Sequence, residues 1–157
     1  MKAKIFSTLL ILFFIVGCMG SQLPTLTPLE IQSLQTREYE QKKEIVFPSV
    51  VSVLSDIGYT ITSGDIKSGL INAESLAESD RASKFWLGIT NVSQTRANVF
   101  VEQIGSITKV RLNFVVTNDK SNVYGQTDRS DVQILDAEAY QNAFEKIENA
   151  IFIRSSN

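Results

Sequence analysis

The chain of 157 residues contains no histidine and only one cysteine, Cys18, so a disulfide within the chain is excluded. These two absences also remove most ligand sets for zinc, copper and haem, and every Ser-His or Cys-His nucleophilic pair. A glycine-rich phosphate loop, a serine elbow and a dinucleotide fingerprint are missing as well. We therefore expect a protein that is not an enzyme and has no cofactor and no metal site.

An excess of basic residues is also missing. The sequence has 15 Lys and Arg against 17 Asp and Glu, which gives a net charge of −2. Lys2 and Lys4 lie in a segment that we expect to be removed, and without them 13 basic and 17 acidic residues give −4. A mildly acidic domain lacks the positive surface that grips phosphate backbones, so we expect no nucleic-acid partner.

The first twenty residues, MKAKIFSTLLILFFIVGCMG, have the layout of a secretory signal. Lys2 and Lys4 form a positive start, residues 5–16 are almost entirely apolar, and the small Gly17 precedes Cys18. The apolar run is short for a membrane span, which needs about 20 residues of helix. The sequence therefore predicts a signal peptide over residues 1–17.

The four residues Ile15, Val16, Gly17 and Cys18 resemble the lipobox of bacterial lipoproteins. The resemblance implies a diacylglycerol thioether on Cys18, cleavage before it, and stable anchoring by two or three acyl chains. Met19 stands where an aspartate would favour the inner membrane in enterobacterial lipoproteins. This implies the periplasmic side of the outer membrane, with the inner membrane as the alternative. An incidental cysteine in an uncleaved anchor, or beside an ordinary signal, is the competing interpretation.

Residues 18–35 are interpreted as the lipidated N-terminus and a tether with two prolines, and residues 36–157 as a single domain. Thr27, Pro28 and Glu30 have the spacing of a helix start and predict one or two helical turns. A short strand is expected over residues 36–40.

Two longer segments have helical periodicity. The first, residues 42–58, ends in a possible capping glycine, Gly58, and contains Pro48, which predicts a late start near Phe47 or a kink. The second, residues 136–153, begins at a possible cap, Asp136. Its predicted apolar stripe consists of Tyr140, Ala143, Phe144, Ile147 and Ile151.

Alternating apolar and polar residues predict strands over 59–62, 69–73, 85–90, 96–104 and 109–117. Ala97, Val99 and Val101 of one strand, and Val110, Leu112, Phe114 and Val116 of another, should face inward. Turns are expected at residues 63–65, 105–106 and 118–122, and polar loops at 74–84 and 124–131. One-sided strands joined by short turns indicate an antiparallel sheet of about four or five strands. With two amphipathic helices on one face, the fold is an α+β two-layer sandwich.

The run over residues 50–75, VVSVLSDIGYTITSGDIKSGLINAES, resembles a module of BamC-type lipoproteins of the outer-membrane β-barrel assembly machinery. The run is also similar to small bacterial lipoproteins in which a helix ending in Leu-x-x-x-Gly leads into a strand, an acidic turn and a Gly-Leu-Ile strand. The resemblance implies helices laid on an antiparallel sheet, and it carries over no functional residue.

Acidic residues are the only candidate acid–base groups. Two loop clusters are candidates: Glu74, Glu78 and Asp80, and Asp128 and Asp131. They would form a paired carboxylate site if the loops met. Asp128 and Asp131, or Asn118 and Asp119, would offer oxygen ligands to calcium, although the spacing of a calcium loop is missing. Solvated loop charge is the interpretation that we favour.

Trp86 is the candidate for partner binding, because it falls on the strand face opposite Phe85 and Leu87. An exposed tryptophan is enriched at binding hot spots, and the alternative is that Trp86 is buried. Phe100 and Ile104 share the solvent face of their own strand and would extend such a patch. The residues predict a partner surface that includes Trp86, Phe100 and Ile104.

Two functional hypotheses follow. The first is a non-enzymatic envelope component that binds another protein in an outer-membrane assembly; the second is a carrier or sensor of a small apolar ligand or a lipid. A cavity of about 300 Å³ or more between sheet and helices would favour the carrier. A filled core with an exposed apolar sheet face would favour the interaction protein, and converging carboxylates would favour an enzyme.

Overall fold

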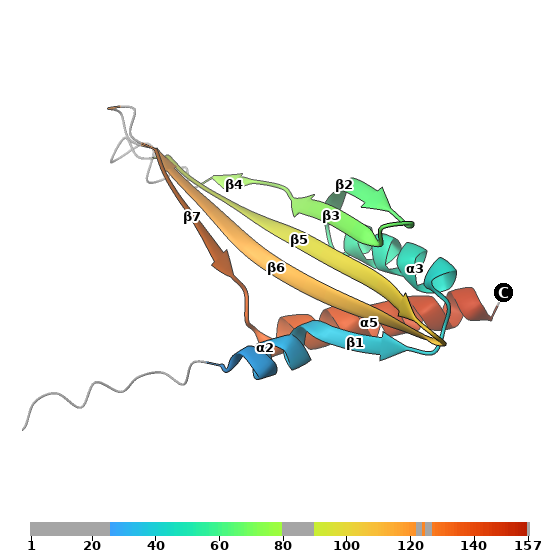
Figure 1. Ribbon diagram of the computed structural model, residues 1–157. Helices are drawn as coiled ribbons and strands as arrows, with labels where there is room; N and C mark the ends of the chain where they lie inside the picture. The colour runs from blue at the N-terminus through green and yellow to red at the C-terminus, as the bar shows by residue number, and fades with distance from the viewer. Residues whose placement is uncertain (1–25, 80–89, 122–123, 125–126, 157) are drawn as a thin grey trace, which may run out of the picture.

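The protein is a two-layer α+β sandwich with an antiparallel sheet in one layer and helices in the other, as predicted (Figure 1). The computed structural model describes residues 26–79, 90–121, 124 and 127–156, without the side chains of residues 78, 79, 90 and 91. Over these ranges the sheet has seven strands rather than four or five. In the same ranges, no helix combines the length and the apolar character needed to cross a membrane.

The described elements follow one another along the chain in a simple order. They are α2 (Pro28–Gln35), β1 (Thr36–Tyr39), α3 (Lys43–Asp56), β2 (Tyr59–Asp65), β3 (Leu70–Ser75), β4 (Glu78–Ser79), β5 (Thr90–Ile104), β6 (Ile107–Ser121), β7 (Thr127–Gln133) and α5 (Ala137–Ser155). The strand order is β1-β6-β5-β3-β2, with β4 also paired to β5 and β7 also paired to β6.

The hairpin of β5 and β6 forms the centre of the sheet and confirms the predicted pair. Its turn is Gly105 and Ser106, and the positive φ of Gly105 (+62°) fits the first central position of a type II′ turn. Both strands are 15 residues long and stay in register from the pair Ile104 and Ile107 to the pair Thr90 and Ser121. Each is therefore long enough to hold two different neighbours along its outer edge.

The core lies between one face of the sheet and the helices α3 and α5. As predicted, the inward residues of β5 and β6 are buried, except Val116, and so is the whole apolar stripe of α5. Every residue of the core cluster, partly buried members included, lies between Leu34 and Ile151. A chain that begins after Cys18 therefore retains everything that holds the described domain together.

Helix α3 begins earlier than its proline suggested. It starts at Lys43, so the predicted late start near Phe47 is wrong, and Pro48 lies inside the helix. Two contacts hold the first turn in place. The Lys43 N–H donates to the Gln103 side chain of β5 at 3.1 Å, and Val46 is fully buried against the sheet. Tertiary packing thus offsets the backbone donor that proline lacks.

The strand β2 is longer than predicted. Residues 63–65, expected to form a turn, belong to β2, which has a register shift between Ile61 and Ser63, and the turn lies at residues 66–69. The Asp65 carboxylate accepts the N–H groups of Ser68 and Lys67, and these bonds lower the pKa of Asp65. The predicted loop 74–84 is likewise wrong at its start, because Glu74 and Ser75 end β3 and residues 78–79 form β4.

The second half of the sheet extends past the helices. Residues 118–121, predicted as a turn, continue β6, and the predicted polar loop 124–131 is largely the strand β7. Every residue of β7 is exposed, so the strand shows no apolar alternation. Figure 1 shows β5, β6 and β7 running beyond α3 and α5. Val116 of β6, expected to be buried, is only partly buried. We call residues 90–95 of β5, 116–121 of β6 and 127–132 of β7, which pair with one another, the arm.

The outer edge of β6 has a gap between the strands β1 and β7. β1 pairs with residues 108–111 and β7 with residues 115–121. In between, the Phe114 N–H donates to the hydroxyl of Tyr140 at 3.2 Å, and the Ile134 N–H donates to the Phe114 carbonyl at 2.8 Å. The Gln35 amide also donates to the Tyr140 hydroxyl, at 3.3 Å. The Tyr140 hydroxyl of α5 therefore accepts the Phe114 N–H in place of the backbone carbonyl of a neighbouring strand.

Helix α2 confirms the helical turns predicted from its first residues. Thr27 and Glu30 form a capping box in which each side chain accepts the other residue's N–H, and these bonds from Thr27 lower the pKa of Glu30. At its other end, Leu34 packs against the core and Gln35 is buried. The end of α2 is thus part of the packed domain.

Candidate functional site

Several predicted site residues lie outside the described ranges. These are the lipidation residue Cys18, the lipobox residues Ile15, Val16 and Gly17, and Trp86 with its neighbours Phe85 and Leu87. Their predicted roles stay predictions. Phe100 and Ile104 are described, and they locate the candidate surface.

Phe100 and Ile104 lie on the sheet face that faces away from the core, as predicted. Phe100 is 39% exposed and Ile104 57% exposed. Leu70 of β3 lies directly opposite Phe100 and is 51% exposed, and Ile107 pairs with Ile104 and is 40% exposed. We call Leu70, Phe100, Ile104 and Ile107 the apolar patch. Leu70 and Ile107 were missed because only the strand register places them beside the other two.

Charged residues separate the two halves of the apolar patch. Glu102 lies opposite Lys109, and Lys109 lies opposite Glu38 of β1, with 3.7 Å between the Lys109 amine and the Glu38 carboxylate. Arg111 lies beside Phe100 on the next strand and is exposed. The face therefore offers two apolar pairs with a row of alternating charge between them, so a partner would have to match both the apolar and the charged groups.

At the base of the arm, the same face of the sheet carries a polar network. The Arg96 guanidinium donates to Thr117 at 2.6 Å and to Asp131 at 3.0 Å, and Thr117 donates to Asp131 at 2.8 Å. The bond from Thr117 and the charge of Arg96 lower the pKa of Asp131. Thr117 is buried beneath these side chains. The network ties β5, β6 and β7 together and explains the burial of a polar residue on this face.

The acidic residues do not converge as a catalytic pair would. Asp128 and Asp131 lie three apart on the strand β7, so their side chains point to opposite faces of the sheet. Glu74 accepts a hydrogen bond from Gln94 at 3.4 Å, and Asp80 lies outside the described residues. No group of three acidic or cysteine residues suited to a metal occurs within the residues that the structure describes.

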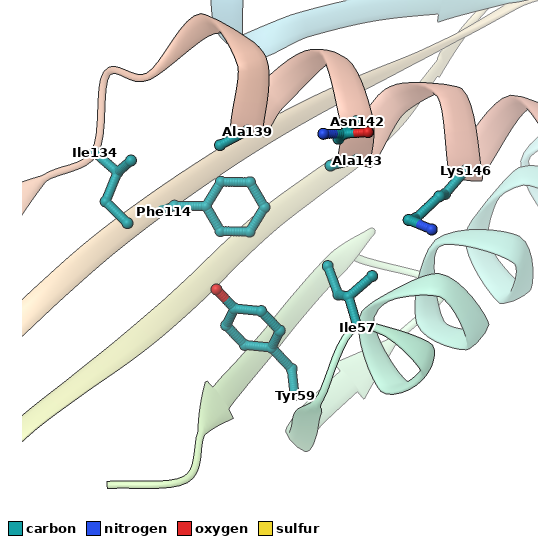
Figure 2. Close-up of a pocket in the computed structure, with 8 residues that line it drawn as sticks. All are labelled: Ile57, Tyr59, Phe114, Ile134, Ala139, Asn142, Ala143 and Lys146. Carbon is teal, nitrogen blue, oxygen red and sulfur yellow. The ribbon is translucent and has the colours of Figure 1, made fainter. Parts of the chain in front are cut away.

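One apolar cavity opens at the end of the helix layer (Figure 2). Its volume is about 160 Å³, and its lining residues are Ile57, Tyr59, Phe114, Ile134, Ala139, Asn142, Ala143 and Lys146. A wider surface groove of about 590 Å³ follows β1 and α5. Its lining includes Arg37, Glu38, Glu145 and Glu148, so it is charged rather than apolar.

No family model matches the chain, and no curated protein matches it. The resemblances in the leader and in residues 50–75 therefore stay predictions from the sequence.

Proposed function

We propose that this protein is an acyl-anchored lipoprotein on the periplasmic side of the outer membrane, and that its domain binds another envelope protein without catalysing a reaction. The observation that supports binding is the exposure of the apolar patch. Leu70, Phe100, Ile104 and Ile107 lie together on the face of the sheet that does not form the core.

Exposure of this kind has a cost that a partner would remove. Burial of apolar surface is favourable by roughly 25 cal/mol per Å². A partner that covered these four large side chains would therefore gain binding free energy. Isolated exposed apolar residues are ordinary, but grouped ones on an open sheet face mark interaction surfaces. The row of Glu102, Lys109 and Glu38 between the pairs would select a partner with complementary charges.

The alternative, a carrier or sensor of a small apolar ligand or a lipid, has less support. The apolar cavity of about 160 Å³ is roughly half of the 300 Å³ at which pockets for drug-sized ligands begin, so it could enclose only a much smaller body. The larger groove along β1 and α5 is lined by charged residues, which suits no acyl chain. The core between the layers is otherwise filled by closely packed apolar side chains.

The anchoring part of the proposal is supported by the order of features in residues 1–18, and metabolic labelling tests it. Cells that express the full chain and receive radiolabelled palmitate should incorporate label into the protein. Cys18→Ser should abolish the label and leave the precursor uncleaved. A Cys18→Ser chain that matures and fractionates like the original would refute the anchor.

Site-specific crosslinking tests the surface. A photo-crosslinking residue at Phe100 in the full chain, in native membranes, should give one dominant adduct, while the same residue at Gln141, exposed on α5, should not. Ile104→Asp should remove the adduct at position 100, because it places a charge within the apolar patch. Asn98→Asp, on the same exposed face, is the matched control and should leave the adduct intact.

Equal adducts from positions 100 and 141, or an adduct that survives Ile104→Asp, would contradict binding through the apolar patch. An adduct with twice the mass of the chain would instead identify the partner as a second copy. Either result leaves the lipid anchor unaffected, so the two parts of the proposal stand or fall separately.

A further inference from the structure

The apolar cavity of Figure 2 lies on the opposite side of the sheet from the apolar patch, between β6, α5 and the junction of α3 with β2. The cavity forms because α5 contributes small side chains here and α3 ends before it reaches this position. Ala139 and Ala143 present only methyl groups from α5, and α3 stops at Asp56, before the chain turns at Gly58 with φ +94°. The space that a longer helix or larger side chains would fill is left open.

Aromatic and aliphatic groups form the walls. The rings of Tyr59 and Phe114 lie with their centroids 6.0 Å apart, and Ile57 and Ile134 close two further sides. Burial raises the pKa of Tyr59, so its hydroxyl stays neutral across the physiological range and acts as a donor. The volume of about 160 Å³ is that of a ring-sized body, and the hollow is open to solvent on the side where Ala139, Asn142 and Lys146 are exposed.

Three polar side chains border this apolar space, and none of them has a hydrogen-bond or ion-pair partner within the residues that the structure describes. They are the hydroxyl of the half-buried Tyr59, and the Asn142 amide and the Lys146 amine, which are exposed to solvent at the opening. Asn142 and Lys146 lie one turn apart on α5, while Tyr59 comes from the other side of the cavity (Figure 2). All three offer donors, and Lys146 adds a positive charge.

An apolar body and a set of unpaired donors together define an amphiphilic ligand. We infer that the cavity binds a small carboxylate with a ring-sized apolar body, placed between Tyr59, Phe114 and α5 with its carboxylate at Lys146 and Asn142. The volume is too small to enclose a long acyl chain, and an amine is disfavoured by the charge of Lys146. The inference concerns a site separate from the apolar patch and does not depend on the proposed function.

The inference is tested by measuring the binding of three ligands of similar size. The protein used is the chain from Met19 to Asn157, which retains the whole core. Benzoate, toluene and benzylamine are titrated, and the methyl signals of Ile57 and Ile134 are followed by NMR, with the remote core residue Ile71 as the internal control. Benzoate should shift the first two signals and leave Ile71 unchanged. It should bind about tenfold more tightly than benzylamine, because only benzoate pairs with Lys146.

Two variants separate the charge from the cavity. Lys146→Gln should lower the affinity for benzoate about tenfold and leave the affinity for toluene unchanged. Ala139→Leu should fill the cavity and abolish the binding of both, while Ala137→Leu, on the same helix but outside the lining, should abolish neither. The unfolding midpoint of each variant shows that it is folded.

Three results would overturn the inference. They are the absence of benzoate shifts at Ile57 and Ile134, equal affinity of the original chain for benzoate and benzylamine, and an unchanged benzoate affinity in Lys146→Gln. The ligand comparison on the original chain needs no variant, so it decides the matter even if Ala139→Leu does not fold. Loss of the crosslink at the apolar patch would not affect any of these measurements.

Discussion

Replacement of Tyr140 by phenylalanine should destabilise the domain although the aromatic ring stays in place. The Tyr140 hydroxyl accepts the Phe114 N–H at 3.2 Å and the Gln35 amide at 3.3 Å, in the gap between β1 and β7. The Tyr140 side chain is fully buried, so water cannot replace the lost acceptor. The ring contact between Tyr140 and Phe114, with centroids 5.3 Å apart, is retained in the variant.

The magnitude follows from the groups that are left without partners. A buried donor that loses its acceptor costs about 1–3 kcal/mol. The Phe114 N–H should contribute most of this cost, because Gln35 keeps a longer contact of 3.5 Å to the Asn113 side chain. We therefore expect the free energy of unfolding of Tyr140→Phe to fall by about 2 kcal/mol. With an m-value of about 2 kcal/mol/M, the urea midpoint should fall by about 1 M.

Equilibrium urea unfolding of the chain from residue 19, followed by circular dichroism, measures this change. The matched control is Tyr59→Phe, since the Tyr59 ring packs against the same Phe114 and its hydroxyl makes no hydrogen bond within the described residues. The control should change stability by about 0.5 kcal/mol or less. Equal effects of the two variants would show that the hydroxyl of Tyr140 does not replace a strand, and the account of the gap would be wrong.

Three further substitutions test other parts of the structure. Tyr39→Phe should be neutral or stabilise by up to about 1 kcal/mol at pH 7, because the buried Tyr39 hydroxyl has no described partner. Burial raises the pKa of Tyr39, so the original chain should lose stability more steeply than Tyr39→Phe as the pH rises above about 10. Asp131→Asn should lower the unfolding midpoint above pH about 4, and the difference should vanish as the pH falls through the lowered pKa of Asp131; a difference unchanged at pH 2 would contradict this. Gly69→Ala should cost well over the roughly 1 kcal/mol expected for Gly58→Ala in thermal unfolding. Both glycines have positive φ, but only at Gly69 would an added Cβ overlap a backbone atom, the Val101 carbonyl oxygen.

The parts of the fold that depend on burial could be predicted from the sequence. Ala97, Val99 and Val101 alternate because one face of β5 is covered, and Tyr140 to Ile151 recur at helical spacing because one face of α5 is covered. The exposed position of Phe100 and Ile104 followed from the same alternation. Burial of one face gives a periodic pattern of apolar residues along the chain, and this pattern predicts the element without knowledge of the elements that pack against it.

The parts that depend on hydrogen bonds to another strand could not be predicted. β7 is exposed along its whole length and is a strand only because its backbone pairs with β6. Leu70 and Ile107 joined the apolar patch only through register, and the contact of Tyr140 with Phe114 joins residues 26 positions apart. None of these features changes the local periodicity, so the sequence contained no signal for them.

The length of β5 and β6 has a consequence for how the sheet opens. The inner parts of these strands, such as residues 97–101 and 110–114, lie beneath the helices, whereas residues 116–121 belong to the arm. Amide protons beneath the helices should exchange with solvent only when the whole domain unfolds. Those of the arm should exchange through local fraying, which needs much less free energy. One continuous strand thus contains two kinetic populations of amides, and the boundary between them should fall where Phe114 meets Tyr140.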